Sequence, residues 1–254
     1  MANPAERKLL DPSELGTKEY WEKAYARELD NNTASASDEG TIWFDENGAE
    51  EAVVKLLDEL EEDGHIRRAG EGASSFLDLG TGNGHMLFTL RGGEEGDGEE
   101  GWEGGMVGVD YSRASVELAR KVAVQRGLQG EPVGFEEWDL LEQEPGSWAG
   151  EGGFGVVLDK GTFDAISLMP QAEGAAHSCE TYRRKVEPLV GAGGFLVVTS
   201  CNWTKEELLS WLAPEGGENE MEFFCDAKYP SFTFGGQTGQ SIVTVAFRRK
   251  EAGR

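Results

Sequence analysis

Acidic residues around a glycine-rich turn are the residues whose types and spacing could do chemistry. Asp78 begins the segment Asp78-Leu-Gly-Thr-Gly-Asn-Gly84, in which glycines stand at positions 80, 82 and 84. Glycine lets the backbone turn sharply and approach a ligand closely, because it lacks a Cβ. The dinucleotide pattern G-x-G-x-x-G would need its third glycine at position 85, where this chain has His85. The turn therefore indicates a nucleoside-containing ligand other than a dinucleotide.

The acid ahead of the first glycine bears on what that ligand is. Asp78 would repel the pyrophosphate of a dinucleotide, whereas the amino-acid end of S-adenosylmethionine carries an ammonium group. We therefore expect S-adenosylmethionine to bind at Asp78 and at the turn residues Gly80, Thr81, Gly82, Asn83 and Gly84.

Two further acids follow the next two predicted strands. An acid about 20 residues past such a turn usually accepts the ribose hydroxyls. Asp110, followed by Tyr111, lies 30 residues past Gly80, and an inserted loop accounts for the excess. Asp139 could accept from an adenine amino group, and Leu140 could contact the base through its amide. The alternatives are a helix-capping surface acid at position 110 and a solvated acidic turn at position 139.

Alternating strands and helices must position these acids. Apolar runs predict buried strands at 75–79, 106–110, 133–138, 154–158 and 195–200. Helices are predicted from about residue 85, over 112–125 with Ser112 as N-cap, and over 205–212 behind a capping box. Two last strands, 222–228 and 241–249, are separated only by the loop 229–240, which is too short for a helical crossover. They should form an antiparallel pair at one end of an otherwise parallel sheet.

Length and composition limit the classes of protein. The 254 residues favour one α/β domain, and no apolar stretch is long enough to span a membrane or form a signal peptide, so a cytoplasmic location is expected. A net charge of −25 opposes nucleic-acid binding and suits a basic protein partner, although the acidity also serves solubility. The cysteines and histidines are scattered, which predicts reduced thiols and no metal site.

Three acidic, glycine-rich stretches interrupt the regular pattern. The segment 91–105 contains seven glycines and a net charge of −5, which predicts a mobile loop. Shorter stretches of similar composition, at 142–153 and 214–220, are expected to be exposed insertions.

The sequence as a whole resembles the class I, seven-strand S-adenosylmethionine-dependent methyltransferases. The block Asp159-Lys-Gly-Thr-Phe-Asp-Ala-Ile-Ser-Leu168 is similar to the motif of lysine methyltransferases that modify translation elongation factor 1-alpha. Segments 15–21, 25–29, 42–44, 199–208 and 232–236 also look like one branch of that group. The resemblance covers about residues 13 to 249.

The resemblance implies a fold, an activity and a substrate. The fold is a Rossmann-like α/β sheet of seven strands, mostly parallel with an antiparallel C-terminal pair and helices on both faces. Residues 1–50 would form a helical segment covering the cofactor site, and 51–254 the methyltransferase domain with its three insertions. The activity would be protein-lysine N-methylation of elongation factor 1-alpha in the cytoplasm. A monomer is expected by default, because the motifs do not address oligomeric state. A methyltransferase of another protein or of a small molecule is the alternative, and a scaffold that has lost catalysis is a second.

Site residues carry over from the matching positions. Methyl transfer needs a neutral, desolvated amine held in line with the donor. Asp159 is expected to accept from or orient that amine, although it could instead pair structurally with Lys160. Core packing competes with a site role for each aromatic residue, and Asp45 departs from the family's usual glycine beside Trp43. We expect Trp43 in the cofactor pocket, and in the substrate groove Lys160, Thr162, Phe163, Trp203 and Phe232, with Phe234 beside it.

Overall fold

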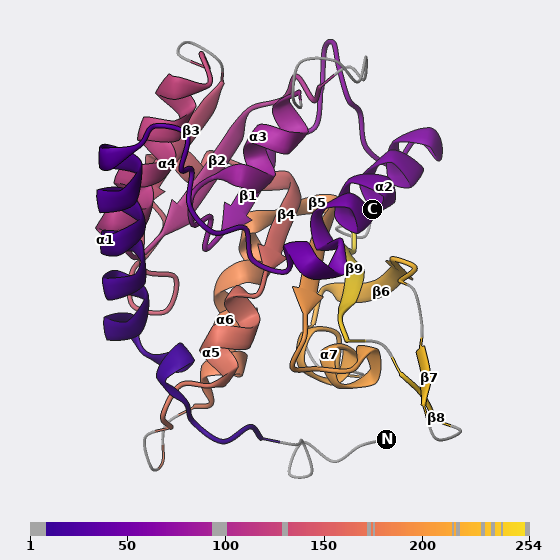
Figure 1. The fold of residues 1–254 in the computed structure, drawn as a ribbon. Helices are drawn as coiled ribbons and strands as arrows, with labels where there is room; N and C mark the ends of the chain where they lie inside the picture. Colours follow the sequence, from indigo (N-terminus) through magenta and orange to yellow (C-terminus); the bar gives the residue numbers. More distant parts are fainter. Residues whose placement is uncertain are drawn as a thin grey trace.

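A central seven-stranded sheet organises the protein (Figure 1). The computed structural model describes residues 9–92, 101–128, 132–171, 174, 176–214, 216, 219–229, 232–234, 237–239 and 241–251. The strands lie in the order β3-β2-β1-β4-β5-β9-β6. Their bounds are β1 Phe76–Leu79, β2 Met106–Asp110, β3 Val133–Glu137, β4 Phe154–Lys160, β5 Val190–Ser200, β6 Met221–Asp226 and β9 Val243–Arg249.

The strand directions confirm the predicted fold class. β1 pairs in parallel with β2 and β4, β2 with β3, and β4 with β5. β9 runs antiparallel to both β5 and β6, which places the antiparallel pair at one end of the sheet. The two strands that follow the helical part of the chain thus extend the sheet without a crossover helix.

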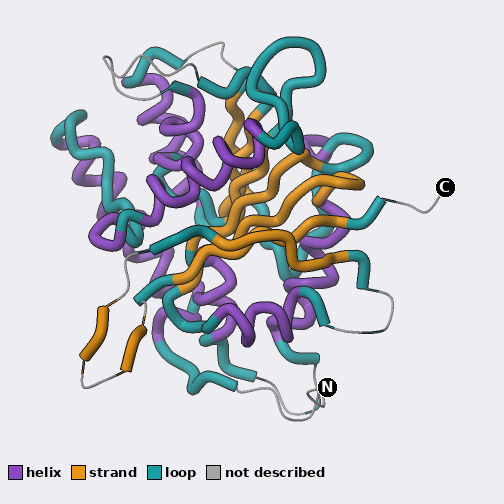
Figure 2. The backbone as a smooth tube through the Cα atoms, turned by 90° about the vertical axis from the view of Figure 1, so that its right-hand side faces the viewer, coloured by secondary structure: helices purple, strands orange, loops and turns teal. Residues whose placement is uncertain are grey.

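Helices cover both faces of the sheet because its strands are apolar on both sides (Figure 2). Alternate residues face opposite layers: Phe76 packs in one core cluster and Leu77 in the other. The first cluster contains side chains from α2 Ala49–Glu62, α3 His85–Arg91 and α4 Arg113–Gln125. The second contains side chains from α5 Thr162–Ser167, α6 Ser178–Val186 and α7 Lys205–Leu212.

Local signals start several of these helices where the sequence predicts. The side chain of Ser112 accepts from the amide of Ser115 and begins α4. Thr204 and Glu207 form the reciprocal capping box that begins α7. The helix at the glycine turn, α3, begins at His85 as expected.

The first long helix, α1 (Lys18–Ala34), lies along α4 at one side of the sheet (Figure 1). Thr17 is its N-cap, and its side chain accepts from the amide of Tyr20. Asn32 is buried and exchanges hydrogen bonds with Gln125 of α4 at 3.1 Å. The short 3₁₀ helices are η2 Glu14–Gly16, η3 Asp45–Asn47, η4 Ser147–Ala149 and η5 Glu187–Leu189.

The prediction of a mobile loop over 91–105 is wrong at both ends of that segment. Arg91 is the last residue of α3, and its guanidinium donates to the carbonyls of Trp102 and Gly104. Trp102 is 1% exposed and meets Phe76 edge to face, with 5.1 Å between ring centroids. A single large aromatic residue therefore anchors the returning chain to the core. Residues 93–100 lie outside the described part.

Two other predicted irregular segments contain ordered structure. Within 142–153, Trp148 of η4 packs against Trp138 at 5.1 Å between ring centroids. Within the predicted loop 229–240, β7 Phe232–Phe234 and β8 Gln237–Gly239 form a separate two-stranded antiparallel sheet. Parts of 214–220 lie outside the described residues.

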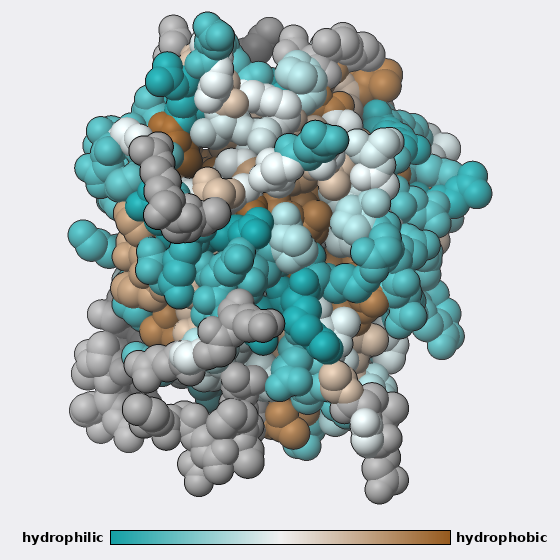
Figure 3. All heavy atoms as spheres, turned by 180° about the vertical axis from the view of Figure 1, so that it is seen from behind, coloured by the Kyte–Doolittle hydropathy of each residue, from teal (hydrophilic) through white to brown (hydrophobic). Residues whose placement is uncertain are grey.

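The surface agrees with a chain of high negative charge. The face seen in Figure 3 is predominantly hydrophilic, with hydrophobic atoms in scattered patches. Among the described residues, the large hydrophobic side chains that are exposed are Leu9, Val124 and Phe223, which are far apart in the sequence. No described helix combines the length and the apolar character needed to cross a membrane.

Candidate active site

A cavity of about 210 Å³ lies where the parallel strands end. Residues directly after β1, β2, β3, β4 and β5 all line it, as expected for a ligand site at the carboxyl edge of such a sheet. Leu15, Lys18, Trp21 and Tyr25 close it from the amino-terminal segment. A smaller hollow of about 30 Å³ shares Tyr25, Trp43, Gly80 and Lys160 with the main cavity.

The glycine turn lies where the main cavity and the hollow adjoin, because Gly80 lines both. Gly80, Gly82 and Gly84 have positive φ angles of 66°, 58° and 83°. A Cβ on Gly80 would lie 2.0 Å from the Thr162 hydroxyl, which donates to the carbonyl of Leu79. Only glycine fits at this close approach between the turn and the start of α5.

The other turn residues divide between the hollow and the core. Thr81, Gly82 and Asn83 line the hollow with Asp78. Gly84 lines neither space, and a Cβ there would meet the rings of Phe88 and Phe135 within 2.9 Å. Gly84 is thus required for packing α3 against the sheet.

Asp78 is a buried acid at the edge of the hollow. Its Oδ2 accepts from the Thr81 hydroxyl at 2.8 Å, and the residue is 4% exposed. Burial raises the pKa of this carboxyl to about 7. A cationic ligand group would favour its ionised form.

Asp110 faces the main cavity from the end of β2. Its carboxylate accepts from the amides of Gly82 and Ser112 and from the Ser115 hydroxyl, which ties the glycine turn to the start of α4. A carboxylate has about four acceptor positions, so one remains for a ligand. Burial raises the pKa of Asp110 to about 6.

Asp139 and Leu140 line the cavity beyond the end of β3, together with Tyr111. Asp139 Oδ1 accepts from the amides of Leu141 and Glu142, and Oδ2 forms an ion pair with Lys18 of α1. The Lys18 ammonium lies 5.7 Å from the centre of the Tyr111 ring. An amino-terminal residue thus reaches the same end of the cavity as the acid.

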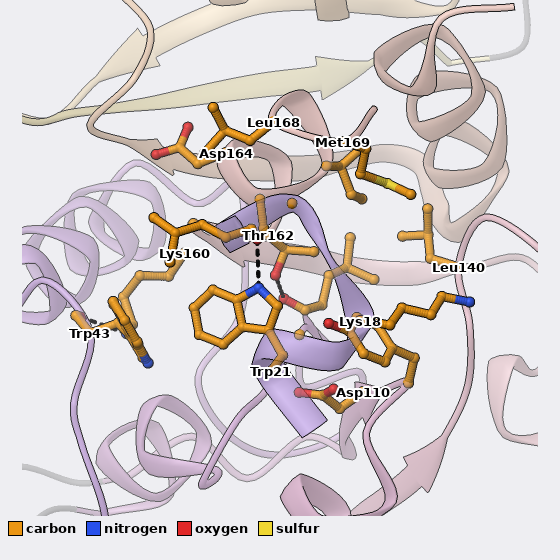
Figure 4. A pocket seen from close by; sticks show the side chains of 18 of the residues that line it. Lys18, Trp21, Trp43, Asp110, Leu140, Lys160, Thr162, Asp164, Leu168 and Met169 are labelled. Atoms are coloured by element: carbon orange, nitrogen blue, oxygen red, sulfur yellow. Dashed lines mark hydrogen bonds between the residues drawn. The ribbon is translucent and has the colours of Figure 1, made fainter. Parts of the chain in front are cut away.

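The amino-terminal segment also supplies an aromatic wall. Trp21 meets Trp43 edge to face at 4.9 Å and stacks on Tyr25 at 6.2 Å between ring centroids. The Trp21 indole donates to the carbonyl of Leu15 at 2.7 Å. In Figure 4, Trp21 lies between Lys160 and Trp43 on one side and Lys18 and Leu140 on the other. Trp43 therefore lines the cavity as predicted, beside Trp21, which no local feature of the sequence marks as a cavity residue.

The structure does not bring Asp159 to the cavity. Both of its oxygens accept from the amide of Phe163, and Oδ2 also accepts from the Tyr182 hydroxyl at 2.6 Å. Asp159 is 1% exposed, and burial raises its pKa to about 7. Because side chains alternate along a strand, Asp159 projects under α5 and α6 while Lys160 projects into the cavity.

Two predicted groove aromatics are also core residues. Phe163 is fully buried and Trp203 is 4% exposed, and both belong to the core under α5, α6 and α7. Lys160 and Thr162 do line the cavity, but Lys160 pairs with Glu50 and donates to the carbonyl of Trp43, not to Asp159. Phe232 and Phe234 lie in β7, and their side chains are outside the described part of the structure.

Several cavity residues carried no recognisable signal in the sequence. The wall formed by α5 and the turn after it is apolar, with Ile166, Leu168 and Met169. Asp164, Cys201 and Asn202 add polar groups there. Their place depends on the helix and strand that carry them, although segments containing them match the family motif.

The combined groups fit a nucleoside joined to a cationic amino acid. Acids stand at successive positions along the cavity, aromatic and aliphatic side chains form its walls, and the hollow provides a small, charged end. This donor set has the chemistry needed for S-adenosylmethionine. Among the described residues, no group of three or more His, Cys, Asp or Glu side chains could hold a metal ion.

Comparison with known proteins shows the family to which the chain belongs. The profile of a family described as "Methyltransferase domain" matches residues 71–246. Protein-lysine N-methyltransferase EFM4 of Saccharomyces cerevisiae is 38% identical over 94% of this chain and 96% of its own length. EEF1A lysine methyltransferase 2 of Danio rerio is 36% identical over 94% and 90%, and that of Homo sapiens 33% over 94% and 88%.

Solved structures show the same fold. The N-methyltransferase NodS of Bradyrhizobium japonicum, in complex with S-adenosyl-L-homocysteine, has a TM-score of 0.54 at 15% identity and covers 91% of this chain and 99% of its own. A TehB-like methyltransferase of Corynebacterium glutamicum has a TM-score of 0.52 at 18% identity, with 90% and 98% covered. The chain therefore belongs to the S-adenosylmethionine-dependent protein-lysine N-methyltransferases.

Proposed function

We propose that this enzyme methylates a lysine of translation elongation factor 1-alpha, acting as a monomer in the cytoplasm. The substrate is suggested by relatives named for it that align over 94% of the chain. The net charge of −25 suits a basic protein partner.

The order of groups along the cavity supports one orientation of the cofactor. We place its adenine at Asp139 and Leu140, its ribose at Asp110 beside Tyr111, and its methionine end at Asp78. Asp139 and Tyr111 line only the main cavity, Asp78 lines only the hollow, and Gly80 lines both. An extended ligand would therefore run past the glycine turn from one space to the other.

The apolar wall at α5 is the observation that carries the lysine assignment. Leu168 and Met169 line the cavity there, and Figure 4 shows them across the cavity from Asp110. The aliphatic stem of a lysine would pack on these side chains, and its amine would reach toward the glycine turn. Asn202, a half-buried neighbour, offers a neutral amide oxygen at the same wall.

This wall would favour the neutral amine that methyl transfer requires. A free lysine has a pKa of about 10.4, and removal from water lowers it. Bound S-adenosylmethionine supplies an electrophilic methyl group on its sulfonium. The amine nitrogen would take the methyl group as the carbon–sulfur bond breaks, leaving a neutral thioether and a methylated ammonium whose proton goes to solvent. The chain's part is to hold the amine in line and exclude water, with the Asn202 amide oxygen accepting a hydrogen bond from the amine.

Asp159 and Asp164 act as positioning residues in this proposal. The carboxylate of Asp164 accepts from the Ser200 hydroxyl and from the amide of Cys201, which fixes the turn that presents Asn202. Asp159 holds the first turn of α5 through the amide of Phe163. Neither acid has to leave its partners for the amine to bind.

Methyl transfer to the purified substrate tests the proposal. Elongation factor 1-alpha is incubated with the enzyme and isotopically labelled S-adenosylmethionine, and its peptides are analysed by mass spectrometry. Label on one lysine is expected with the wild type and with Glu51→Gln, an exposed residue of α2, and not with Asp110→Ala. An unlabelled substrate, with cofactor binding intact by calorimetry, would reject elongation factor 1-alpha as the substrate.

A further inference from the structure

A charged pair at the small hollow is not used by the proposed placement of adenine, ribose and lysine. Glu50, near the start of α2, and Lys160, at the end of β4, both line the hollow. The distance between Lys160 Nζ and Glu50 Oε1 is 3.5 Å. Asp78 lines the same hollow, so two acids and one base from three separate elements meet there.

Glu50 has one oxygen engaged and one oxygen open. Oε2 accepts from Nδ1 of His85 at 2.7 Å. Glu50 is only 7% exposed, and its Oε1 is buried with no hydrogen-bond partner among the described residues. Burial would raise the pKa of Glu50, but the His85 hydrogen bond and the Lys160 charge outweigh it and lower the pKa. The Lys160 ammonium at 3.5 Å balances the charge of Oε1 but makes no hydrogen bond of normal geometry to it, so a buried acceptor position is left that a ligand donor could fill.

Lys160 is held in place but keeps donors to spare. Its ammonium donates to the carbonyl of Trp43 at 2.8 Å, and only 14% of its side chain is exposed. Three N–H groups are available on a lysine, and the 3.5 Å contact with Glu50 is longer than a hydrogen bond of normal length. Lys160 lines both the hollow and the main cavity, so it lies where the two spaces adjoin.

We propose that Glu50 and Lys160 recognise the zwitterionic amino-acid end of S-adenosylmethionine. Glu50 Oε1 accepts from the ligand's α-ammonium, alongside Asp78, and Lys160 donates to the ligand's α-carboxylate. The inference rests on the proposed location of the methionine end at Asp78. Lys160, which was expected to contact the substrate, would contact the cofactor instead. Glu50, which lies outside the glycine-turn motif, becomes a further cofactor-binding residue.

The chemistry of a zwitterion matches this pair better than a single charge would. A ligand with only an ammonium group would be repelled by the Lys160 charge. A ligand with only a carboxylate would be repelled by Glu50 and Asp78. A ligand that carries both groups on one carbon satisfies the open Glu50 oxygen and a Lys160 donor together. Charge-assisted hydrogen bonds of this kind are stronger than neutral ones, so each should have a measurable effect on affinity.

Calorimetric binding of three nucleosides separates the two contacts. The ligands are S-adenosylhomocysteine, its decarboxylated analogue, which lacks the α-carboxylate, and 5′-methylthioadenosine, which lacks the whole amino-acid end. Glu50→Gln should weaken the first two at least about tenfold and leave the third within twofold. Lys160→Met should weaken only S-adenosylhomocysteine by that factor.

Matched controls come from the exposed face of α2. Glu51→Gln and Lys55→Met make the same chemical changes at exposed positions and should leave all three affinities unchanged. Thermal unfolding of each variant is measured in parallel, and Lys160→Gln replaces Lys160→Met where the latter does not fold. Binding of 5′-methylthioadenosine serves as an internal check on the adenosine end.

Two results would overturn the inference. One is unchanged affinity for S-adenosylhomocysteine in both variants. The other is an equal loss for all three ligands, because that would show a general effect on the cavity. The selective pattern without methylation of elongation factor 1-alpha would keep the inference and reject only the proposed substrate.

Discussion

Asp110 at the end of β2 and Asp159 near the end of β4 are alike in almost every local property. Both are buried, both accept from backbone amides and from a hydroxyl, and burial raises the pKa of both, to about 6 and about 7. Only Asp110 lines the cavity. Burial and a shifted pKa therefore do not distinguish an acid that lines the cavity from one that does not in this protein.

The face of the sheet to which each side chain points makes the difference. Asp159 is followed by Lys160, which takes the cavity side, so the acid is directed toward the core under α5 and α6. Asp110 is the last residue of its strand, where the chain turns into α4 and carries the carboxylate over the strand end. A shift of one residue along a strand thus moves a side chain from the cavity side of the sheet to the core side.

Replacing Asp159 should have the largest effect, and the effect should be on stability. Asp159→Ala leaves the Phe163 amide and the Tyr182 hydroxyl buried without an acceptor, at about 1–3 kcal/mol each. We expect the free energy of unfolding in urea to fall by about 3 kcal/mol, with a smaller loss for Tyr182→Phe. Affinity for S-adenosylhomocysteine should change less than about threefold. Normal stability together with abolished methyl transfer would instead make Asp159 a catalytic residue.

Replacing Asp110 should reverse that pattern. Asp110→Ala removes the predicted ribose acceptor and the tie to the glycine turn, so S-adenosylhomocysteine should bind at least about tenfold more weakly by calorimetry. The matched comparison is Asp159→Ala measured in the same buffer. Unchanged affinity for the Asp110 variant would remove this residue from the site.

The raised pKa of Asp78 predicts that cofactor binding depends on pH. A carboxyl with a folded-state pKa of about 7 binds its ammonium partner only when ionised, so affinity should fall as the pH drops. We expect about a fourfold loss for S-adenosylhomocysteine between pH 8 and pH 6.5. Proton release on binding, measured in buffers of different ionisation enthalpy, gives an independent check. A flat profile, with Asp78→Asn binding as tightly as wild type, would contradict the role of Asp78.

The raised carboxyl pKa values also predict how the stability of the ligand-free protein changes with pH. The folded-state pKa values of Asp78, Asp110 and Asp159 lie above the usual value of 3.8, so the folded chain holds protons that the unfolded chain has lost. This contribution is fully present below about pH 4 and is lost as the pH rises through about 7. Bound cofactor should reduce the contribution of Asp78 to the pH dependence of the free energy of unfolding and leave that of Asp159 unchanged. Urea unfolding at several pH values, with and without ligand, measures the difference.

The ion pair of Lys18 should have the smallest effect. Half of the Lys18 side chain is exposed, and exposed pairs contribute roughly 0.2–1 kcal/mol. Lys18→Met should therefore change S-adenosylhomocysteine affinity by no more than about two- to threefold in either direction, and less at high salt. A tenfold loss would instead show that Lys18 itself contacts the cofactor.

The sheet could be predicted from the sequence more fully than the site. Apolar runs, the Ser112 N-cap and the capping box at Thr204 are local signals, and each formed the predicted element. Trp102 could not be assigned to the core because its neighbours are glycines and acids, and one aromatic contact decides its place. The predicted loop 229–240 contains β7 and β8, which are three residues each and therefore too short to show an alternating pattern in the sequence.

The glycine turn and the acids Asp110 and Asp139 stand at or just beyond the ends of predicted strands, so the sequence alone could locate them. Lys18, Trp21 and Glu50 could not be located in this way, because they reach the cavity or the hollow from helices whose packing brings distant segments together. The sequence predicts that Asp159 orients the target amine, because position along the chain does not show to which side of the strand the carboxylate points. Side-chain direction is a tertiary property at such an edge.

A crystal structure of the enzyme with S-adenosylhomocysteine tests the contrast between the two acids most directly. We expect the Asp110 carboxylate within hydrogen-bonding distance of the ribose hydroxyls, with Asp159 still bound to the Phe163 amide and the Tyr182 hydroxyl. A ligand that leaves Asp110 without contact, or an Asp159 carboxylate turned into the cavity, would contradict it.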